Sequence, residues 1–318
     1  MYRDKTVAVV VPAYNEEVLI RTVIETMPAF VDKVIVVNDK STDNTAAVVR
    51  EYVQQDPDRV ELVDLEVNQG VGGAIAEGYK VARDMQIDCT AVMAGDAQMD
   101  PGDLPKLLDP VIEGRADYTK GNRLFYGDAW HMIPKVRYLG NSGLSLLTKI
   151  ASGYWHVADS QTGYTVASLE VLQTLKLDAI YKRYGMPNDM LVKLNVYDFR
   201  VKDVHVKPVY NVGEKSGIRI RKVFFTIPLL LLRLFTYRMT QKYVIRDFHP
   251  LVLFYTFGLS LLLVDIPFLI RFFYMWIKTG NVPPITAMAI VFFTITGLQS
   301  FLFAMLFDME ANKDLQGK

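Results

Sequence analysis

The sequence predicts an α/β fold with a mostly parallel sheet, followed by interfacial helices and a transmembrane hairpin of two helices. Two observations predict this arrangement. Short β-branched or apolar runs alternate with helical patterns up to about residue 200, and two long apolar segments lie near the C-terminus. The chain of 318 residues has room for one α/β domain of about 200 residues and an appendage.

The first part of the chain is expected to alternate strands with helices. Four runs have the length and residue types of buried strands, namely Val7–Val11, Val34–Val37, Val60–Leu65 and Thr90–Met93. Three segments between them show helical patterns, namely Glu16–Met27, Asn44–Gln55 and Gly73–Met85. The resulting βαβαβαβ order favours parallel pairing of the strands.

Charge and cysteine content exclude some classes of partner and of cellular compartment. The 35 Lys and Arg residues balance 35 Asp and Glu residues, so no net field attracts nucleic acid and no nucleic-acid partner is expected. The single cysteine, Cys89, lies in an expected strand, which excludes an internal disulfide and fits a reducing compartment. The apolar run Val7–Ala13 is too short for a signal peptide, so we expect the N-terminal domain to stay in the cytosol.

Two apolar segments near the C-terminus predict the membrane hairpin. Leu251–Ile270 contains one charged residue, Asp265, and Ile285–Phe307 contains none. Each segment is long enough to cross a hydrocarbon core of about 30 Å as a helix, and only a short loop separates them. Basic residues precede the hairpin, and positive charge marks the cytosolic side of a membrane. We therefore expect an integral protein of the cell (inner) membrane with both termini in the cytosol.

The segment before the hairpin predicts helices that lie at the membrane surface. Val223–Leu232 is apolar but too short to span, and Pro228 is expected to break it. Three cations then recur every four residues on one helical face, which is typical of an interfacial helix: Arg238, Lys242 and Arg246. The expected domains are a cytosolic domain over 1–217, juxtamembrane amphipathic helices over 218–248, and a membrane domain over 249–318 with spans at about 251–272 and 285–307.

Acidic residues follow the fourth expected strand. The segment MAGDAQMDP, Met93–Pro101, places Asp96, Gln98 and Asp100 where the strand would run out into a loop. In an open α/β sheet, ligands bind outside the carboxyl ends of the strands. Acids in this position are placed to hold a metal ion bound to a phosphate. For Asp100, capping of a helix that begins near Pro101 is an alternative role.

A glycine-rich turn follows the third expected strand. Gly70, Gly72 and Gly73 open a helix, as in a dinucleotide-binding fold, but Ile75 stands where that fingerprint requires Gly or Ala. The fingerprint would also normally follow the first strand. We interpret the segment as a tight turn whose glycines let the backbone approach either a neighbouring helix or a phosphate.

Six motifs follow one another in a recognisable order. They are VPAYNE at 11–16, NDKSTDNT at 38–45, NQGVGGA at 68–74, MAGDAQMDP at 93–101, KGNR at 120–123 and DSQTGY at 159–164. Their order and spacing resemble those of family 2 glycosyltransferases, which have the Rossmann-like GT-A fold. More narrowly, the chain is similar to the polyprenyl-phosphate glycosyltransferases, the group that includes dolichol-phosphate mannose synthase. The resemblance covers residues 6–216, and the paired C-terminal spans fit the bacterial members of the group.

The resemblance implies a nucleotide site at the N-terminal motifs. In the family, the segment that matches Pro12, Ala13, Tyr14 and Glu16 wraps the nucleotide base and ribose. The family carboxylate that matches Asp39 hydrogen-bonds the base. These roles suit the residues themselves, since a strand-end carboxylate accepts from a base N–H and a tyrosine packs on a ring.

The resemblance also implies a divalent metal. Asp96 matches the second aspartate of the family's DxD motif, which ligates a metal on the sugar-nucleotide diphosphate, and Ala94 replaces the first. The implied metal site therefore consists of Asp96 with Gln98, and the implied ion is Mg²⁺ or Mn²⁺. Such an ion often takes only one or two protein ligands and completes its shell with phosphate oxygens and water.

For the acceptor, the resemblance implies a phosphate held by cations. Arg123 and Arg137 match the two family arginines that grip the acceptor phosphate, and guanidinium groups suit bidentate phosphate binding. Lys215, in GEKSG at 213–217, is a further phosphate ligand by similarity to the family's GESK loop. Asp159 matches the aspartate often treated as the catalytic base. A phosphate oxygen is already anionic, so fixing the sugar or orienting the arginines suits Asp159 equally.

The implied reaction is an inverting transfer of a sugar from a UDP- or GDP-linked nucleotide sugar to undecaprenyl or dolichyl phosphate at the cytosolic membrane face. Asp96 and Asp159 are the implied catalytic residues. One alternative is a processive polysaccharide synthase, whose QxxRW acceptor motif this chain lacks. The other is a noncatalytic membrane adaptor, suggested by Ala94. The sugar and the oligomeric state stay open, with a homo-oligomer as one outcome.

Overall fold

The computed structural model describes residues 1–124, 135–209 and 220–318, and within these ranges the side chains of 135–139, 141 and 220–225 lie outside the described part. The chain divides into two compact units. The first unit holds Met1–Phe235 together with Asp314–Lys318, and the second holds Thr236–Lys313. The chain therefore leaves the first unit, forms the second, and returns to the first at its C-terminus.

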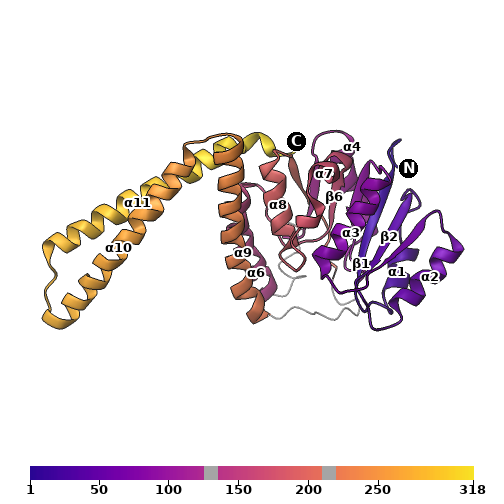
Figure 1. Ribbon diagram of the computed structural model, residues 1–318, viewed down its shortest axis with the longest axis horizontal. Helices are drawn as coiled ribbons and strands as arrows, with labels where there is room; N and C mark the ends of the chain where they lie inside the picture. Colours follow the sequence, from indigo (N-terminus) through magenta and orange to yellow (C-terminus); the bar gives the residue numbers. More distant parts are fainter. Residues whose placement is uncertain (125–134, 210–219) are drawn as a thin grey trace. The chain divides into compact units, whose positions relative to one another are not determined.

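The described residues of the first unit form a seven-stranded sheet (Figure 1). Its strands are β1 (Val7–Ala13), β2 (Lys33–Asn38), β3 (Val60–Asp64), β4 (Cys89–Val92), β5 (Tyr118–Asn122), β6 (Thr165–Ser168) and β7 (Val201–His205). Their order across the sheet is β3-β2-β1-β4-β6-β5-β7, and the neighbours pair in parallel except where β6 takes part. The predicted α/β fold with a mostly parallel sheet is confirmed.

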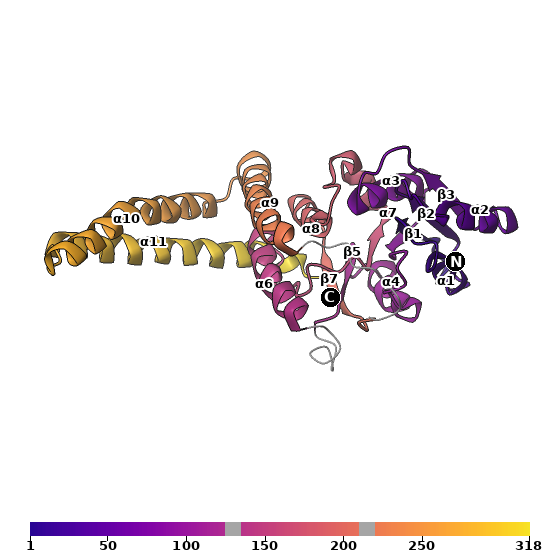
Figure 2. The ribbon, with the colours of Figure 1, turned by 90° about the horizontal axis from the view of Figure 1, so that it is seen from below.

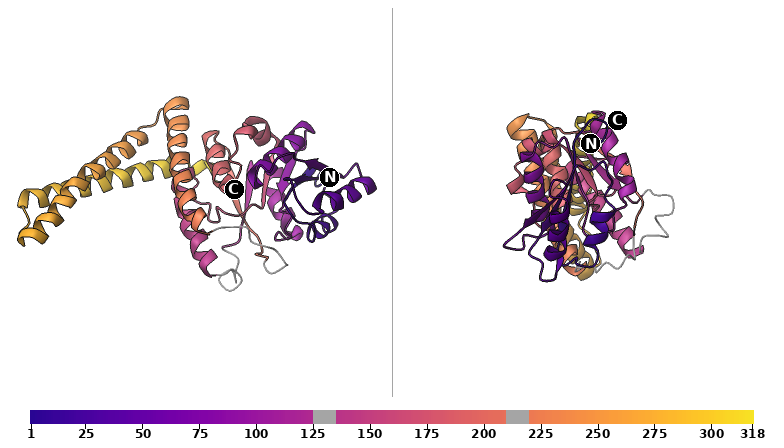
Figure 3. Two further views of the ribbon diagram at one scale, coloured as in Figure 1. Left: turned by 60° about the horizontal axis from the view of Figure 1, so that its bottom comes forward. Right: turned by 90° about the vertical axis from the view of Figure 1, so that its right-hand side faces the viewer.

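Helices cover both faces of this sheet (Figure 3). The helices described up to residue 240 are α1 (Ile20–Glu25), α2 (Thr45–Gln55), α3 (Val71–Asp84), α4 (Leu104–Ile112), α6 (Lys135–Ser152), α7 (Leu169–Thr174), α8 (Met186–Val196) and α9 (Ile220–Thr240), of which α9 packs on α6 and α8. Val7, Val9 and Val11 enter one apolar core with α1, α2 and α4, whereas Ala8 and Val10 enter a second core with α3, α7 and α8. This alternation follows from the strand, in which successive side chains point to opposite faces.

The expected helix from Glu16 begins later than its sequence pattern predicts. α1 starts at Ile20, because Asn15 adopts a left-handed φ of 57° and the chain makes a turn before the helix. In that turn the N–H groups of Leu19 and Ile20 both donate to the Glu16 carbonyl oxygen. The irregular segment after β1 therefore keeps Glu16 near the end of the strand.

The glycine-rich turn at residues 70–73 packs against another part of the backbone. The N–H of Gly72 donates to the Lys182 carbonyl oxygen at 3.0 Å, and a Cβ at Gly72 would lie 2.1 Å from the Tyr181 carbonyl oxygen. Gly70 has a φ of 84°, which an L side chain rarely adopts. Of the two approaches that the sequence left open for these glycines, the structure shows an approach to a neighbouring backbone segment.

The C-terminal residues extend the edge of the sheet beside β7. Val201 forms a parallel bridge with Gln316, and the N–H of Gly317 donates to the Val201 carbonyl oxygen at 3.0 Å. The N–H of Lys318 donates to the Arg115 carbonyl oxygen at 3.2 Å. The chain end, marked in Figure 3, is therefore tied to the sheet by its backbone.

The second unit is dominated by two long helices that pack side by side, α10 (Leu251–Thr279) and α11 (Pro284–Ala311) (Figure 2). Both are long and apolar enough to cross a membrane. A core helix of a soluble protein would be mostly buried, whereas large apolar side chains such as Ile277 and Ile285 are each 83% exposed in this chain. The exposure favours a lipid-facing pair over a core helix.

Small and polar residues hold α10 and α11 together. A Cβ at Gly258 would lie 2.9 Å from the Gly297 carbonyl oxygen, so glycine permits the close contact. Asp265, the one charged residue of the first apolar segment, is buried between the helices and accepts a hydrogen bond from the Thr294 hydroxyl at 2.6 Å. The carboxylate is therefore shielded from the surface of the pair.

Two of the cations predicted for the membrane interface are buried instead. Arg238 is fully buried and forms a bidentate ion pair with Asp308, through Nη1 at 2.7 Å and Nη2 at 2.8 Å. Lys242 is buried as well, and its Nζ donates to Asn312 at 3.0 Å. The predicted interfacial placement of these two side chains is wrong, because each has a partner about 70 residues later that a local pattern does not show.

The helix that carries Arg238 is also longer than predicted. α9 continues through Pro228, which was expected to break it, and a π-helix follows at Gln241–Arg246. Ile227 and Leu231, on either side of the proline, are buried in an apolar cluster with α6 and α8. The free energy gained by burying these two side chains offsets the free energy lost because proline cannot donate a backbone hydrogen bond.

Substitution of Gly317 tests the docking of the C-terminal residues. A Cβ there would lie 2.8 Å from the Ala116 Cβ, so we expect Gly317→Ala to lower the free energy of unfolding by about 1–3 kcal/mol. Gln316→Ala, which truncates an exposed side chain in the same segment, should change it by less than about 0.5 kcal/mol. Thermal unfolding of both variants in detergent measures the difference. Equal stability of the two variants would contradict the docking.

Candidate functional site

The loops that follow β1, β2 and β4 meet at one edge of the sheet, because these strands are parallel neighbours. The N–H of Asp39 donates to the Ala13 carbonyl oxygen at 2.9 Å, and the N–H of Gly95 donates to that of Pro12 at 3.2 Å. A Cβ at Gly95 would lie 3.5 Å from the Glu16 Cγ. The structure therefore brings together the three segments predicted to bind the nucleotide and its metal.

Each of these three loops contains a non-glycine residue in the left-handed region. Their φ angles are 57° at Asn15, 61° at Lys40 and 56° at Ala97. Such conformations cost free energy and persist only where the surrounding structure imposes them, which is common at functional sites. Tyr14, next to Asn15, is 49% exposed, so its ring lies at the surface of this edge.

Asp39 holds the glycine-rich turn in place. It is buried, and its two carboxylate oxygens accept from the N–H groups of Gln69 at 2.6 Å and Gly70 at 2.8 Å. Burial raises the pKa of Asp39, while the two N–H donors oppose that shift. The structure thus shows an anchoring role for Asp39 beside the nucleotide role that the sequence predicts.

Asp96 and Gln98 lie together in the loop after β4. The Gln98 N–H donates to the Asp96 carboxylate at 3.1 Å, and the Gln98 side-chain nitrogen is buried with no hydrogen-bond partner among the described residues. Glu16 lies close enough to interact electrostatically with Asp96. Burial, together with the charges of Asp96 and Asp43, raises the pKa of Glu16 to about 7.

These oxygen ligands fit a hard divalent cation. Within the described ranges there is no group of three or more His, Cys, Asp or Glu side chains that could hold a metal by itself. Asp96 and Gln98 would therefore supply few ligands, and phosphate oxygens and water would supply the rest. A cation would also relieve the repulsion between Glu16 and Asp96. Asp100 has the alternative capping role, since one of its carboxylate oxygens accepts from the Gly102 N–H in the turn at Pro101–Asp103.

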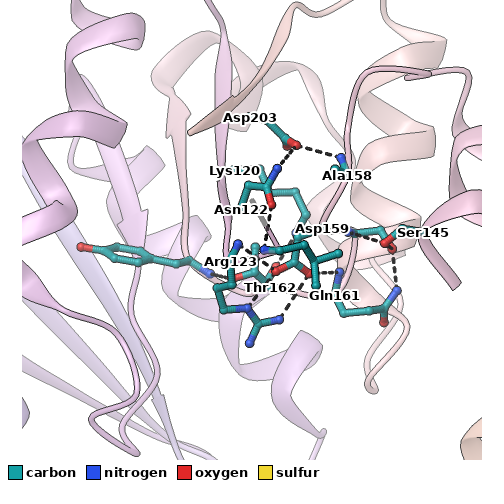
Figure 4. A network of polar contacts seen from close by, with 12 residues as sticks. Lys120, Asn122, Arg123, Ser145, Ala158, Asp159, Gln161, Thr162 and Asp203 are labelled. Carbon is teal, nitrogen blue, oxygen red and sulfur yellow. Dashed lines mark hydrogen bonds and ion pairs between the residues drawn. The ribbon is translucent and has the colours of Figure 1, made fainter. Parts of the chain in front are cut away.

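Arg123 and Asp159 form an ion pair at the end of β5 (Figure 4). Arg123 Nε lies 2.8 Å from one carboxylate oxygen of Asp159, and Nη2 lies 3.3 Å from the other. The Arg123 N–H also donates to the carboxylate, at 3.2 Å. Asp159 is fully buried, whereas the Arg123 side chain remains 24% exposed. The pair therefore presents only its cationic member to solvent.

The ion pair determines the charge state of Asp159. Burial disfavours its ionised form, but Arg123 and Lys120 together outweigh that penalty and hold the pKa of the carboxyl below its ordinary value. A carboxylate with a lowered pKa is a weak base. Of the roles left open for Asp159, orienting Arg123 is the one that the geometry supports.

The DSQTGY segment contacts the loop that holds Asp96. The Tyr164 hydroxyl donates to the Asp100 carbonyl oxygen at 3.0 Å. The Tyr164 carbonyl oxygen in turn accepts from the Gly121 N–H at 2.8 Å, two residues before Arg123. Tyr164 therefore connects the predicted donor half of the site to the predicted acceptor half.

Behind Arg123 lies a buried network of polar side chains that the sequence did not predict. Asp203, on β7, accepts from the Ala158 N–H at 2.7 Å and from the Asn122 side-chain amide at 2.9 Å. Lys120 is buried and its ammonium donates to the Thr162 carbonyl oxygen. Burial lowers the pKa of Lys120 to about 8 and raises that of Asp203 to about 6. Lys120 lies in the KGNR motif, whereas Asp203 lies in none of the six motifs and no local pattern predicted its role.

The remaining predicted acceptor residues are only partly described. Arg137 lies in α6, and its side chain lies outside the described part. Lys215 also lies outside the described residues. A later part of α6 touches the site, because Ser145 forms a hydrogen bond with the N–H of Ser160, next to Asp159, at 3.1 Å.

A family model and two similar proteins agree on the family of this chain. The model of glycosyl transferase family 2 matches residues 8–175, which is more than half of the chain. The chain is 29% identical to a UDP-N-acetylglucosamine–dolichyl-phosphate N-acetylglucosaminyltransferase of Methanococcus voltae, over 71% of this chain and 96% of the relative. It is 27% identical to a polyprenol monophosphomannose synthase of Mycolicibacterium smegmatis, over 69% of this chain and 84% of the relative.

A solved structure shares the fold. Glucosyl-3-phosphoglycerate synthase from Mycobacterium tuberculosis, in complex with Mn²⁺, UDP and phosphoglyceric acid, superposes with a TM-score of 0.55 at 20% identity. The match covers 74% of this chain and 78% of that one. At this identity the likeness concerns the fold, and it confirms the predicted GT-A type of sheet.

The charge of Glu16 should make the metal-free protein less stable at high pH. Its folded pKa is raised to about 7, so its contribution to stability is present at acidic pH and is lost as the pH rises through about 7. We expect Glu16→Gln to differ little from the wild type at about pH 5 and to be more stable at about pH 8. Thermal unfolding in a chelator measures this, with exposed Glu66→Gln as the control. A Glu16→Gln effect that does not depend on pH would contradict the electrostatic coupling.

Proposed function

The chain belongs to glycosyl transferase family 2, and on that premise we propose that it transfers a sugar from a nucleotide sugar to a polyprenyl phosphate. The observation that carries the proposal is the junction of two halves at one edge of the sheet. Asp39 and Asp96 lie in one half, and the Arg123–Asp159 pair lies in the other. The names of the two relatives, which state a dolichyl-phosphate or polyprenol substrate, support the acceptor.

On the donor side, the segment from Pro12 to Glu16 wraps the base and ribose, and Asp39 hydrogen-bonds the base. The half-exposed ring of Tyr14 supports this role. Asp96 and Gln98 hold Mg²⁺ or Mn²⁺, and the Mn²⁺ and UDP in the solved relative support a divalent metal beside a nucleotide. When bound, the cation stabilises the negative charge of the leaving nucleoside diphosphate.

On the acceptor side, Arg123, Arg137 and Lys215 grip the lipid phosphate. An anionic phosphate oxygen attacks the anomeric carbon and forms the new C–O bond. The bond from that carbon to the diphosphate breaks, and the nucleoside diphosphate leaves with the electron pair, so the anomeric configuration inverts. The attacking oxygen needs no base, because a phosphate monoester is already ionised near neutral pH. Asp159 keeps the Arg123 guanidinium in place.

At the membrane, α10 and α11 form a transmembrane hairpin, and the catalytic domain lies on the cytosolic side of the inner membrane. The C-terminal residues, which follow α11, pair with β7 of the sheet. This pairing supports a topology in which the catalytic domain and the C-terminus lie on the same side. We retain the division at 1–217, 218–248 and 249–318, with the change that Arg238 and Lys242 are buried within the second unit.

Turnover of labelled nucleotide sugars with a short polyprenyl phosphate tests the function. We expect transfer from one UDP- or GDP-linked sugar that requires a divalent cation and is lost in Asp96→Ala, because no second acidic residue occupies the DxD position. Unchanged thermal unfolding would show that the variant is folded, and Asp100→Asn, at a capping carboxylate, is the control. Near wild-type turnover of Asp96→Ala in saturating metal would overturn its role. Absence of transfer by the wild type would favour the adaptor.

Cysteine labelling of intact cells tests the topology. A probe at Asn281, in the loop between α10 and α11, should react with a membrane-impermeant reagent added outside the cells. A probe at Gln316, whose side chain is exposed in the first unit, should react only after lysis. Native Cys89 is buried and should stay unlabelled in both. The opposite pattern would place the catalytic domain outside the cytosol.

A further inference from the structure

Asp203 touches the residues that precede both members of the Arg123–Asp159 pair. One carboxylate oxygen accepts from the N–H of Ala158, at 2.7 Å, and from the side-chain amide of Asn122, at 2.9 Å. Figure 4 shows Asp203 reaching toward both neighbours. A single side chain on β7 therefore ties the backbone before Asp159 to the side chain before Arg123.

Asn122 extends this tie to the far side of Arg123. Its amide nitrogen donates to Asp203, and its amide oxygen accepts from the N–H of Leu124 at 3.0 Å. Asn122 itself is fully buried. The backbone on both sides of Arg123 is thus held through one amide whose orientation depends on Asp203.

Lys120 closes the network from β5. Its ammonium donates to the carbonyl oxygen of Thr162, three residues after Asp159, and it interacts electrostatically with both Asp159 and Asp203. Lys120, Arg123, Asp159 and Asp203 together carry no net charge when all are ionised. Lys120 and Asp159 are buried, whereas Arg123 is partly exposed. Buried charges of this kind contribute little net stability compared with apolar residues of the same size, so their placement favours a role in geometry.

We propose that Asp203 is a positioning residue for the acceptor site, acting through its hydrogen bonds to Ala158 and Asn122. The inference rests on the proposed function, in which Arg123 binds the acceptor phosphate. A guanidinium binds a phosphate through paired hydrogen bonds of defined direction, so a shift of the Arg123 backbone weakens that contact. The donor half depends on β1, β2 and β4, and should be unaffected.

The strand pair that carries Asp203 also contains a matched control. Asp117, just before β5, accepts from the N–H of Arg200 at 2.7 Å and pairs with its guanidinium at 2.7 Å. It therefore joins the residues just before the same two strands, β5 and β7, and like Asp203 it accepts from a backbone N–H. Asp117 lies at the opposite end of β5 from Arg123. Loss of either carboxylate should lower the free energy of unfolding, but only loss of the Asp203 carboxylate should raise the acceptor KM.

The test compares Asp203→Ala, Asp203→Asn, Asp117→Ala and Arg123→Ala with the wild type, using a short polyprenyl phosphate and the nucleotide sugar that the wild type accepts. Asp203→Ala should raise the acceptor KM by about tenfold, equivalent to about 1.4 kcal/mol, with the donor KM unchanged. The acceptor KM of Asp203→Asn should be close to the wild-type value, since the amide oxygen can still accept hydrogen bonds from Ala158 and Asn122. Asp117→Ala should keep the wild-type KM for both substrates. Nucleotide titration gives the folded fraction of each variant, so loss of folded protein does not mimic a change in KM.

Two results would overturn the positioning role alone. One is a raised acceptor KM in Arg123→Ala with an unchanged acceptor KM in Asp203→Ala. The other is an Asp203→Asn variant as impaired in acceptor KM as Asp203→Ala, since the hydrogen bonds would then not be what matters. If the wild type fails to use polyprenyl phosphate, or if Arg123→Ala leaves the acceptor KM unchanged, the acceptor assignment itself fails and the inference fails with it.

Discussion

The site depends on the reversed direction of one strand. β6 lies between β4 and β5 and is antiparallel to both, with Thr165 opposite both Val92 and Lys120. The segment that enters β6 therefore lies at the edge where β4 and β5 end. Had β6 been parallel, Asp159 would lie at the opposite edge, far from Arg123. The antiparallel strand joins the proposed nucleotide half to the proposed acceptor half, and the Tyr164 hydroxyl donates to the Asp100 carbonyl oxygen between them.

Buried ion pairs fix the chain where segments distant in sequence must meet. Arg123 and Asp159 are 36 residues apart, and Arg238 and Asp308 are 70 apart. A buried pair adds little stability over apolar packing, but the loss of one partner leaves an uncompensated charge and is costly. Each pair therefore disfavours other arrangements of its segments. In the first unit this holds an arginine at the site, and in the second it ties α9 to the end of α11.

The path of the chain returns its C-terminal residues to the sheet. The chain leaves the sheet domain, forms a hairpin that is long and apolar enough to cross a bilayer, and returns to pair with β7. β7 also carries Asp203 and pairs with β5, which ends just before Arg123. The C-terminal residues pair at Val201, the first residue of β7, whose partner on β5 is Tyr118. They therefore hold the end of this strand pair that lies away from Arg123.

The sequence by itself determined the alternation of strands and helices, the two long apolar segments, the family and the motifs that meet at the ends of β1, β2 and β4, because periodicity, strand-end motifs and long apolar runs are local properties. It misplaced Arg238 and Lys242, whose four-residue spacing resembles an interfacial face. It also did not reveal Asp203. Only the tertiary structure decided which cations are paired, which glycines approach another backbone, and that Asp159 holds Arg123. The physical reason is that a charged side chain takes its role from its partner, and these partners lie dozens of residues away.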